Sequence, residues 1–240
     1  MQENRDSWGV LAHVDAPTVF KWLQAQSLLE KLVLKGSTHQ QEFIRYLRNE
    51  PTVIEIAATL RSTSYLCHSS AMFVHALLDQ QPSVLYVNYE QSAKPRPPGG
   101  LTQASVDRAF RGKQRESTFA FECGESQIIL LSGKHTNNLE VQNSPLPSGA
   151  TVRVTSIERT LIDISVRPSY AGGVEAVLEA YPRAKGRIAI PKLPLNSEEA
   201  RLRLPFSSND RFLSKSRWLP EKVLDAAEEA WPQLGLLSGV

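Results

Sequence analysis

The sequence predicts an α+β fold, and three features of its 240 residues support this. Residues 1–80 carry mainly helix-spaced apolar side chains, the middle of the chain carries short β-branched and aromatic runs, and a helical pattern returns after Thr155. The connections between the strand-like runs are short and rich in Gly, Asn, Ser and Pro, which favours antiparallel pairing. Blocks of helix, strand and helix therefore favour a mainly antiparallel sheet flanked by helices over a wound βαβ sheet.

An N-terminal helical region is expected first. Asp15 can cap its first helix and Pro17 suits the first turn. Apolar residues carry this pattern to Leu32, where Leu32–Leu34 can become a short strand. Apolar residues at helical spacing predict three more helices; they cover His39–Arg48, Val53–Leu60 and the stretch from Ser69 to Leu77, the last capped by Ser69 or Ser70.

The middle of the chain has a residue pattern typical of β-strands. Runs of β-branched and aromatic residues predict five strands; these are Val84–Tyr89, Thr118–Glu122, Gln127–Leu131, Asn138–Val141 and Thr151–Val154. A connection dense in Pro and Gly, Ala93–Gly100, separates the first strand from the second. A short helix from Thr102 to Phe110 follows that connection.

The segment after Thr155 predicts two short helices joined at a proline. Thr155 and Glu158 have the spacing of a capping box, and Pro168 ends the first helix. An apolar stripe formed by Ile157, Leu161 and Ile164 leaves the charged residues mostly on the other side. The pairs Arg159–Asp163 and Asp163–Arg167 have opposite charges at i,i+4 spacing. By the residues alone, this is a scaffold helix with a solvated, self-paired charged face.

Composition sets limits on the protein class. With 41% apolar and 22% charged residues the chain can bury a core, and a formal charge of +2 is too small to indicate a nucleic-acid-binding protein by itself. Cys67 and Cys123 are far apart and lack metal-ligand spacing, so we expect two buried thiols, no metal and no cofactor. No apolar run is long enough for a membrane span, and the charged stretch 1–6 does not suit a signal peptide. We therefore expect a cytoplasmic protein.

Two patterns near the middle of the N-terminal half leave alternatives open. Residues 56–72 have the rhythm of a helix-turn-helix, although the second helix would carry no Lys or Arg with which to bind phosphates, which favours a packed helical pair. His68 and His75 are seven residues apart and could share one helical face. Because two turns of helix separate them by roughly 10 Å, one metal ion cannot be held by that pair alone.

Charged clusters offer two further candidates. The strongest basic cluster could bind phosphates or an acidic partner, or could be a solvated surface; it consists of Lys94, Arg96, Arg108, Arg111, Lys113 and Arg115. Glu122, Glu125 and Lys134 imitate the acid-and-lysine pattern of a nuclease, without the Pro-Asp element that would support it. No P-loop, G-x-S-x-G or H-E-x-x-H motif is present, so we expect no catalytic residues.

Several motifs together resemble the AbiEi family of antitoxins, the neutralising halves of bacterial type IV toxin–antitoxin pairs. Residues 158–163 read E-R-T-L-I-D and residues 166–174 read V-R-P-x-Y-A-G-G-V; residues 65–82 are similar to the family's Y-L-S-H-x-S-A-L-x-x-H-G-L-T-D-Q-x-P. Shorter matches begin at Glu90, Leu101, Val106, Lys113 and Leu131, the last being Leu131-Ser-Gly-Lys-His-Thr136. The matched residues that we single out are Tyr65, His68, Ser70, His75, Glu158, Arg159, Asp163, Arg167, Pro168, Gly172 and Gly173.

The two ends of the chain depart from the family pattern. Family members carry an N-terminal winged helix, which we can place only as a remnant in region 1–50, with the helix up to Leu32 and its following strand bearing Lys21, Lys31 and Lys35. The antitoxin-like domain covers residues 51–194 and a divergent tail covers 195–240. Residues 192–218 replace the family's Y-P-[FY]-H-Q-x-I-G-F-x-L text with unrelated side chains. A local frameshift is one hypothesis for this, and the nucleotide sequence decides it.

The resemblance implies a non-enzymatic antitoxin with a defined set of partners. It would counter a cognate nucleotidyltransferase toxin in phage defence, and it would repress its own operon by binding operator DNA. The basic cluster would then face toxin, nucleotide or DNA. Two alternatives stay open, namely a stand-alone DNA-binding transcriptional regulator and, ranked lower, a nuclease-like enzyme.

Overall fold

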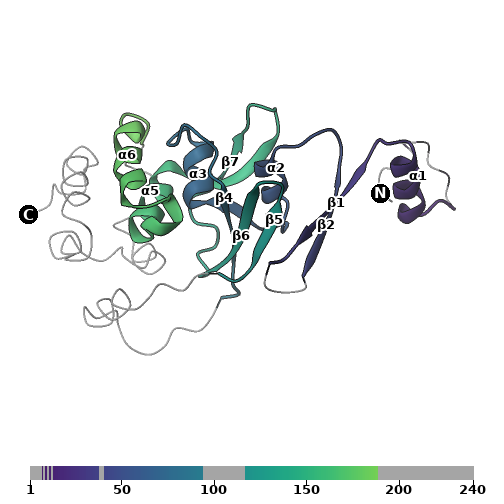
Figure 1. Cartoon of the computed structure of the whole chain (residues 1–240), viewed down its shortest axis with the longest axis horizontal. Coiled ribbons are helices and arrows are strands. Elements are labelled where there is room, and N and C mark those ends of the chain that lie inside the picture. The colour runs from purple at the N-terminus through teal and green to yellow at the C-terminus, as the bar shows by residue number, and fades with distance from the viewer. Residues whose placement is uncertain are drawn as a thin grey trace, which may run out of the picture.

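The computed structural model describes residues 7, 9, 11, 13–37, 41–93 and 117–188, and these form an α+β fold as predicted. Figure 1 shows a twisted sheet at the centre, with helices α3, α5 and α6 on one face and helix α2 with a two-stranded hairpin toward the other. The basic cluster at 94–115, the helix expected from Thr102 to Phe110 and the tail 195–240 with the divergent segment 192–218 lie outside the described residues.

The elements follow one another in an order that mixes helices with strands. They are α1 (Ala16–Ala25), β1 (Glu30–Lys35), β2 (Glu42–Leu47), α2 (Val53–Ala58), β3 (Tyr65–Cys67), α3 (His68–Val74), β4 (Val84–Glu90), β5 (Ala120–Cys123), β6 (Ser126–Gly133), β7 (Val141–Pro145), β8 (Thr151–Thr155), α5 (Ile157–Val166), the 3-10 helix η2 (Pro168–Ala171) and α6 (Val174–Ala184). None of the helices in the described part of the chain has the length and apolar character that crossing a membrane requires.

The main sheet is mixed. Its six strands have the order β5-β6-β4-β3-β8-β7. The pairs β5–β6, β3–β4 and β7–β8 are antiparallel, whereas β4–β6 and β3–β8 are parallel. The expected antiparallel character therefore holds for the hairpin-like neighbours, and parallel pairing arises where strands distant in sequence come together. β1 and β2 form a separate antiparallel hairpin.

Alternation along the strands sends side chains to two different cores. In β4, Leu85 and Val87 join the core that packs against α2 and the hairpin, whereas Tyr86 faces the helices on the other side. A further core joins α3, α5, η2 and α6 around Leu161 and Ile164. The predicted apolar stripe of the α5 segment is thus buried, and the helical layer forms a core of its own next to the sheet.

The helix predicted over His39–Arg48 is wrong, because the structure has strand β2 there. Phe43, Arg45 and Leu47 point toward the body of the molecule, and Ile44 and Tyr46 point outward. This is a period of two, although the same apolar positions also suit helical spacing. Pairing with β1 decides between the two patterns. The first predicted helix is also shorter than expected: α1 is capped by Asp15 as predicted but ends at Ala25.

Two other boundaries need correction. The fourth helix begins at His68 and not at Ser69 or Ser70, because Tyr65–Cys67 forms a short strand that is buried on both faces and shows no alternation. The strand predicted over 138–141 begins only at Val141. Asn137, Asn138 and Glu140 have positive φ angles of 57°, 52° and 52°, which strand residues do not adopt.

The capping box predicted for α5 is also wrong. Ser156 is the N-cap, and its Oγ accepts a hydrogen bond from the Arg159 amide at 3.2 Å. Thr155 is fully buried, and its Oγ lies 2.8 Å from the Oγ of Thr160. A capping box does occur at α2, where Thr52 and Glu55 exchange hydrogen bonds. The T-x-x-E pattern located the α5 terminus to within one residue but assigned the wrong cap.

Arg45 attaches the hairpin to the body of the molecule. Its Nη2 donates to the carbonyl oxygens of Thr59 at 2.6 Å and Leu60 at 2.7 Å, and its Nε donates to the Thr59 carbonyl at 3.1 Å. These carbonyls lie at the C-terminal end of α2, where helical hydrogen bonding leaves acceptors unpaired. The guanidinium therefore caps α2 and fixes β2 beside it.

We expect Arg45→Ala to lower the free energy of unfolding by roughly 1–2 kcal/mol, because hydrogen bonds from a charged donor to otherwise unpaired carbonyls are lost. Urea unfolding followed by far-ultraviolet circular dichroism measures this change. Arg48→Ala is the matched control, since Arg48 is an exposed arginine three residues further along. Equal effects of the two substitutions would contradict the proposed role of Arg45.

Candidate functional site

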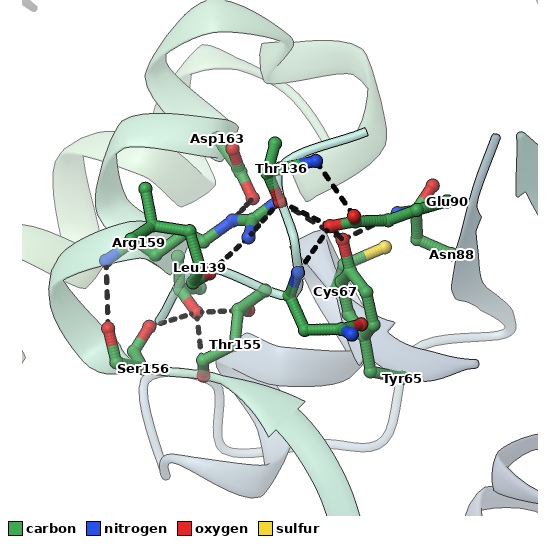
Figure 2. A network of polar contacts seen from close by, with 12 residues as sticks. Tyr65, Cys67, Asn88, Glu90, Thr136, Leu139, Thr155, Ser156, Arg159 and Asp163 are labelled. Atoms are coloured by element: carbon green, nitrogen blue, oxygen red, sulfur yellow. Dashed lines mark hydrogen bonds and ion pairs between the residues drawn. The ribbon is translucent and has the colours of Figure 1, made fainter. Parts of the chain in front are cut away.

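Residues from four separate segments meet beneath helix α5 in one polar network (Figure 2). Tyr65 begins β3, Asn88 and Glu90 lie toward the end of β4, Thr136 lies in the connection after β6, and Arg159 and Asp163 lie on α5. We call these six residues the Arg159 cluster. It lies on the helix-covered side of the main sheet, opposite the hairpin.

Arg159 is the centre of the cluster and is only 7% exposed. Its Nη1 donates to the Leu139 carbonyl and, at 3.3 Å, to the Thr136 Oγ. Its Nη2 donates to the Tyr65 hydroxyl at 3.1 Å, and its Nε lies 3.4 Å from a carboxylate oxygen of Asp163. Although burial opposes the charge, the neighbouring Asp163 carboxylate raises the pKa of Arg159 above its ordinary value.

Glu90 is the second charged anchor, and its side chain is 8% exposed. Its carboxylate accepts hydrogen bonds from the Thr136 amide at 2.7 Å, the Asn138 amide at 3.1 Å and the Thr136 hydroxyl. Burial alone would raise the pKa of Glu90. The hydrogen bonds from Thr136 and Asn138 and the Arg159 charge outweigh burial and hold this pKa below its ordinary value.

Tyr65 and Asn88 connect the two charged anchors. The Tyr65 hydroxyl accepts from Arg159 and, at 2.6 Å, from the Asn88 amide, and donates to Glu90 at 3.3 Å. Burial raises the pKa of Tyr65, so the phenol keeps its proton and can act as a donor. Gly133 makes room for Asn88, because a Cβ at that position would come within 2.5 Å of the amide oxygen.

Asp163 lies on the more solvent-exposed side of the cluster. Its side chain retains 23% exposure, and its oxygen faces the Arg159 Nε along the predicted i,i+4 spacing. Burial raises the pKa of Asp163, and Arg159 and Arg167 act against that rise. The second predicted pair, Asp163–Arg167, does not form: Arg167 leaves helical geometry at φ −134°, and its Nη1 contacts the hydroxyl of Tyr170 at 3.4 Å.

The cluster fixes the connection from β6 to β7 in an unusual backbone path. Three residues of this connection, Asn137, Asn138 and Glu140, adopt left-handed conformations that cost energy for residues other than glycine. Glu90 holds its first half through Thr136 and Asn138, and Arg159 holds its second half through Leu139. The arrangement therefore works as a clamp that joins β4, α5 and this connection.

The prediction of a solvated charged face is wrong for Arg159, which is buried, and only Arg167 is exposed as that prediction requires. Glu158 is partly buried in the first turn of α5. The proline and glycines behave as predicted. Pro168 begins η2 directly after α5, and Gly172 and Gly173 turn the chain into α6 with φ angles of 96° and 114°.

The other matched residues pack inside the fold. His68 is 9% exposed, lies edge-on to Tyr86 and Tyr170, and burial with the nearby arginine charges lowers its pKa to about 3. The His75 Nε2 donates to the Thr155 carbonyl at 2.6 Å. The Ser70 Oγ accepts from the Tyr86 amide at 2.7 Å. The two histidines therefore serve separate contacts, and within the described residues no three potential metal ligands gather.

The helix-turn-helix interpretation of residues 56–72 does not fit this packing. The start of the supposed recognition helix is strand β3 at the centre of the sheet, and the first five residues of α3 are buried. A recognition helix must present its side chains to the major groove. Helix α3 cannot do so, and its lack of lysine and arginine agrees with that burial.

The remaining charged candidates among the described residues lie at the surface and are not members of the Arg159 cluster. Lys31 and Lys35 lie on β1 and Lys21 on α1, and all three are exposed. The nuclease-like set does not converge, because Glu125 lies in the turn before β6 and Lys134 follows the far end of that strand. At about 3.3 Å per residue these two are roughly 25–30 Å apart.

Sequence reasoning missed Glu90, Asn88 and Thr136 as partners of Arg159. A buried carboxylate at the end of an apolar strand is uncommon, and Asn88 and Glu90 within the Val84–Glu90 run were the available signal. Their partner in α5 lies 69 or more residues away in sequence, so no local pattern could connect them. Most donors and acceptors of the cluster bond one another, and the buried Arg159 Nε, which has no hydrogen-bond partner, has the Asp163 carboxylate 3.4 Å away; this suits a structural clamp.

We expect Arg159→Met to lower the free energy of unfolding by about 3–5 kcal/mol, because it leaves Asp163 and Glu90 without a buried positive partner. Urea unfolding measures the loss. Arg153→Met, on the neighbouring strand β8, is the matched control and should change stability by less than about 1 kcal/mol. A loss at Arg159 as small as that of the control would contradict the clamp.

We expect Glu90→Gln to lower stability by roughly 1.5–3 kcal/mol at neutral pH, because hydrogen bonds to a charged acceptor are weakened. The pKa of Glu90 is lower in the folded chain than its ordinary value of 4.5, so its contribution is complete above pH 4.5 and is lost as the pH falls through the folded-state pKa. The gap between wild type and variant should therefore narrow below pH 4.5.

Thermal unfolding at a series of pH values measures this gap. Glu122→Gln, at an exposed position on β5, is the matched control and should follow the wild type throughout. A gap between the wild type and Glu90→Gln that stays constant down to the acid unfolding transition would contradict the role assigned to the carboxylate.

The chain matches no protein-family model and no curated protein. The sequence motifs singled out above include Tyr65, Glu90, Thr136, Arg159 and Asp163. In the structure these five residues are in one cluster.

Proposed function

We propose that this chain is an AbiEi-like antitoxin that counters a cognate nucleotidyltransferase toxin. The observation that supports the proposal most strongly is the convergence of the matched motifs on the Arg159 cluster. Tyr65 and Arg159 come from motifs that are 94 residues apart, yet their side chains are hydrogen-bonded. Glu90 and Thr136 come from two further matched motifs and are bonded to each other.

The convergence shows that the motifs are parts of one fold in this chain. Residues that match a family by chance have no cause to contact one another, whereas residues that stabilise one fold do. Each of these matched segments supplies at least one hydrogen bond to the Arg159 cluster. The matched motifs therefore belong to one connected part of the fold. Toxin neutralisation is the proposed activity, and it rests on the resemblance of these motifs.

A non-enzymatic mechanism fits the chemistry of the cluster. The Glu90 carboxylate is occupied by amide and hydroxyl donors, and the Tyr65 phenol keeps its proton because burial raises its pKa. Neither group is free to move a proton to or from a substrate. The cluster fixes the end of β4, after which the sequence continues into the basic segment 94–115. We propose this segment as the partner-binding region.

DNA binding by the N-terminal region is a second candidate function, and one observation favours it. Helix α1 is followed directly by the β1–β2 hairpin, which is the order of recognition helix and wing in a winged helix. Lys31 shares the outer face of the hairpin with Tyr46, its cross-strand partner, and Phe20 of α1 stacks on Tyr46 at 4.9 Å. Lysines beside an aromatic surface suit contact with phosphates.

Co-expression with a nucleotidyltransferase toxin encoded beside this gene tests the main proposal. We expect the full chain to restore growth, and we expect Arg159→Met to restore it at least tenfold less well at elevated temperature, because the clamp fails (roughly the factor expected for a loss above 1.4 kcal/mol). Growth is measured as colony-forming units with toxin induced. A chain that is present at normal abundance and leaves toxicity unchanged would contradict the antitoxin function.

A charge-reversed variant, Lys31→Glu with Lys35→Glu, separates the two candidates. If the main proposal is correct, this variant still restores growth, since both lysines are exposed and remote from the clamp. Loss of binding to the operon's promoter fragment in the same variant would support the second candidate. The salt dependence of wild-type binding then reports how many phosphates are contacted.

A further inference from the structure

We propose that the outer face of the β1–β2 hairpin, together with helix α1, binds single-stranded nucleic acid by stacking bases on aromatic rings. Proteins that bind single strands without sequence preference combine exposed aromatic rings with cations that follow the nucleic-acid backbone. Both features occur on this face. The inference does not depend on the antitoxin activity, and it differs from operator binding because stacking requires unpaired bases.

Exposed apolar side chains gather in the N-terminal part of the described chain. Among the described residues, the large apolar side chains with the highest exposure all lie before residue 47, with the exception of Phe119. Helix α1 has no buried residue, so it contributes none to a core. Figure 1 shows α1 and the hairpin on the side of the main sheet away from α5 and α6. A concentration of exposed apolar surface of this kind marks a binding surface.

The aromatic part of this face is a stack of two rings. Phe20 of α1 and Tyr46 of β2 stack with their ring centroids 4.9 Å apart and their planes 29° apart. Phe20 is 38% exposed and Tyr46 is 43% exposed, so the stack leaves accessible surface on both residues. Ile44 continues the exposed apolar surface along β2. Because every base has a flat π-face, an unpaired base can extend such a stack.

The basic part of the face lies on β1. Residues that are paired across the hairpin share a face, and the outer-face pairs are Lys31–Tyr46, Val33–Ile44 and Lys35–Glu42. Lys31 and Lys35 are exposed and lie roughly 13 Å apart along the strand. Glu42 lies at the end of β2 away from Tyr46. A nucleic-acid backbone that runs along β1 would therefore meet both lysines, while its bases lie over β2.

The composition of the face favours a single strand over other occupants. A duplex offers phosphates and base edges, which a recognition helix reads with polar and basic side chains. Helix α1 carries one charged residue, Lys21, whose charge also acts on the neighbouring cap Asp15. An apolar protein partner would leave Lys31 without a counter-charge beside the rings, whereas a polyanion supplies one. A single strand uses both the rings and the lysines.

Fluorescence anisotropy with the full chain and a labelled oligothymidylate of about twelve nucleotides tests the proposal. A duplex of the same length and of arbitrary sequence is the comparison probe. We expect the single strand to bind at least about tenfold more tightly than the duplex, because only the single strand offers base faces. Binding of the single strand should weaken as the salt concentration is raised.

Two substitutions of Tyr46 separate stacking from apolar contact. Tyr46→Leu keeps an apolar side chain and removes the ring, so we expect it to weaken binding roughly fivefold or more, the lower end for the loss of one stacked base. Tyr46→Phe keeps the ring and should bind like the wild type. Phe119→Leu is the matched control, since Phe119 is 37% exposed and lies outside the hairpin. Thermal unfolding should show that all three variants fold.

Lys31→Gln tests the basic part of the site without changing a ring. We expect the slope of log affinity against log salt concentration to fall in magnitude by about 0.7, the value for one phosphate contact of a single strand. Lys185→Gln, at an exposed position directly after α6, should leave the slope unchanged.

Four results would overturn the proposal. They are absence of binding to the single strand, equal affinity for single strand and duplex, wild-type affinity of Tyr46→Leu, and an unchanged salt slope in Lys31→Gln. Tighter binding of the duplex would overturn it in favour of groove recognition by the same region. Growth rescue against the toxin is a separate measurement, so failure of this proposal and failure of the antitoxin function are distinguishable.

Discussion

The buried guanidinium of Arg159 is the interaction on which the rest of this fold depends. Removing a positive charge from water is costly, and the cost is offset only where opposite charges and hydrogen-bond acceptors surround the group. Here the acceptors come from β3, the β6–β7 connection and α5 itself. Each of these elements therefore contributes to the same requirement, namely that one buried cation be surrounded by acceptors and by an opposite charge.

Glu90 extends this requirement to a part of the chain that Arg159 does not reach directly. Its carboxylate lies on the far side of Tyr65 and Thr136, so positive and negative charge are connected through hydroxyl groups. Connected hydrogen bonds of this kind polarise one another in a low-dielectric interior. The left-handed residues of the β6–β7 connection are stable in that setting, because an amide and a carbonyl of that connection serve as partners of the two charges.

Local sequence patterns predicted the elements whose cause is local. The Asp15 cap, the β4 strand and the turn at Pro168 and Gly172 follow from capping, propensity and backbone freedom, and the structure confirms them. The β2 strand was mistaken for a helix because its apolar spacing suits both periods. The burial of Arg159 could not be predicted from α5 alone, because the same i,i+4 charge pattern occurs on buried and on solvated helices. Whether the charged face is buried depends on partners that are distant in sequence.

The wide separation of the clamp's partners along the chain has a consequence for biosynthesis. Strands β3 and β4 emerge from the ribosome well before α5, so Tyr65 and Glu90 are made long before their cation exists. During that interval the central strands lack both their charge partner and the parallel neighbour β8. Contacts so distant in sequence form late and slow folding. Nascent chains that stall before residue 159 would therefore expose the middle of the sheet to chaperones and proteases.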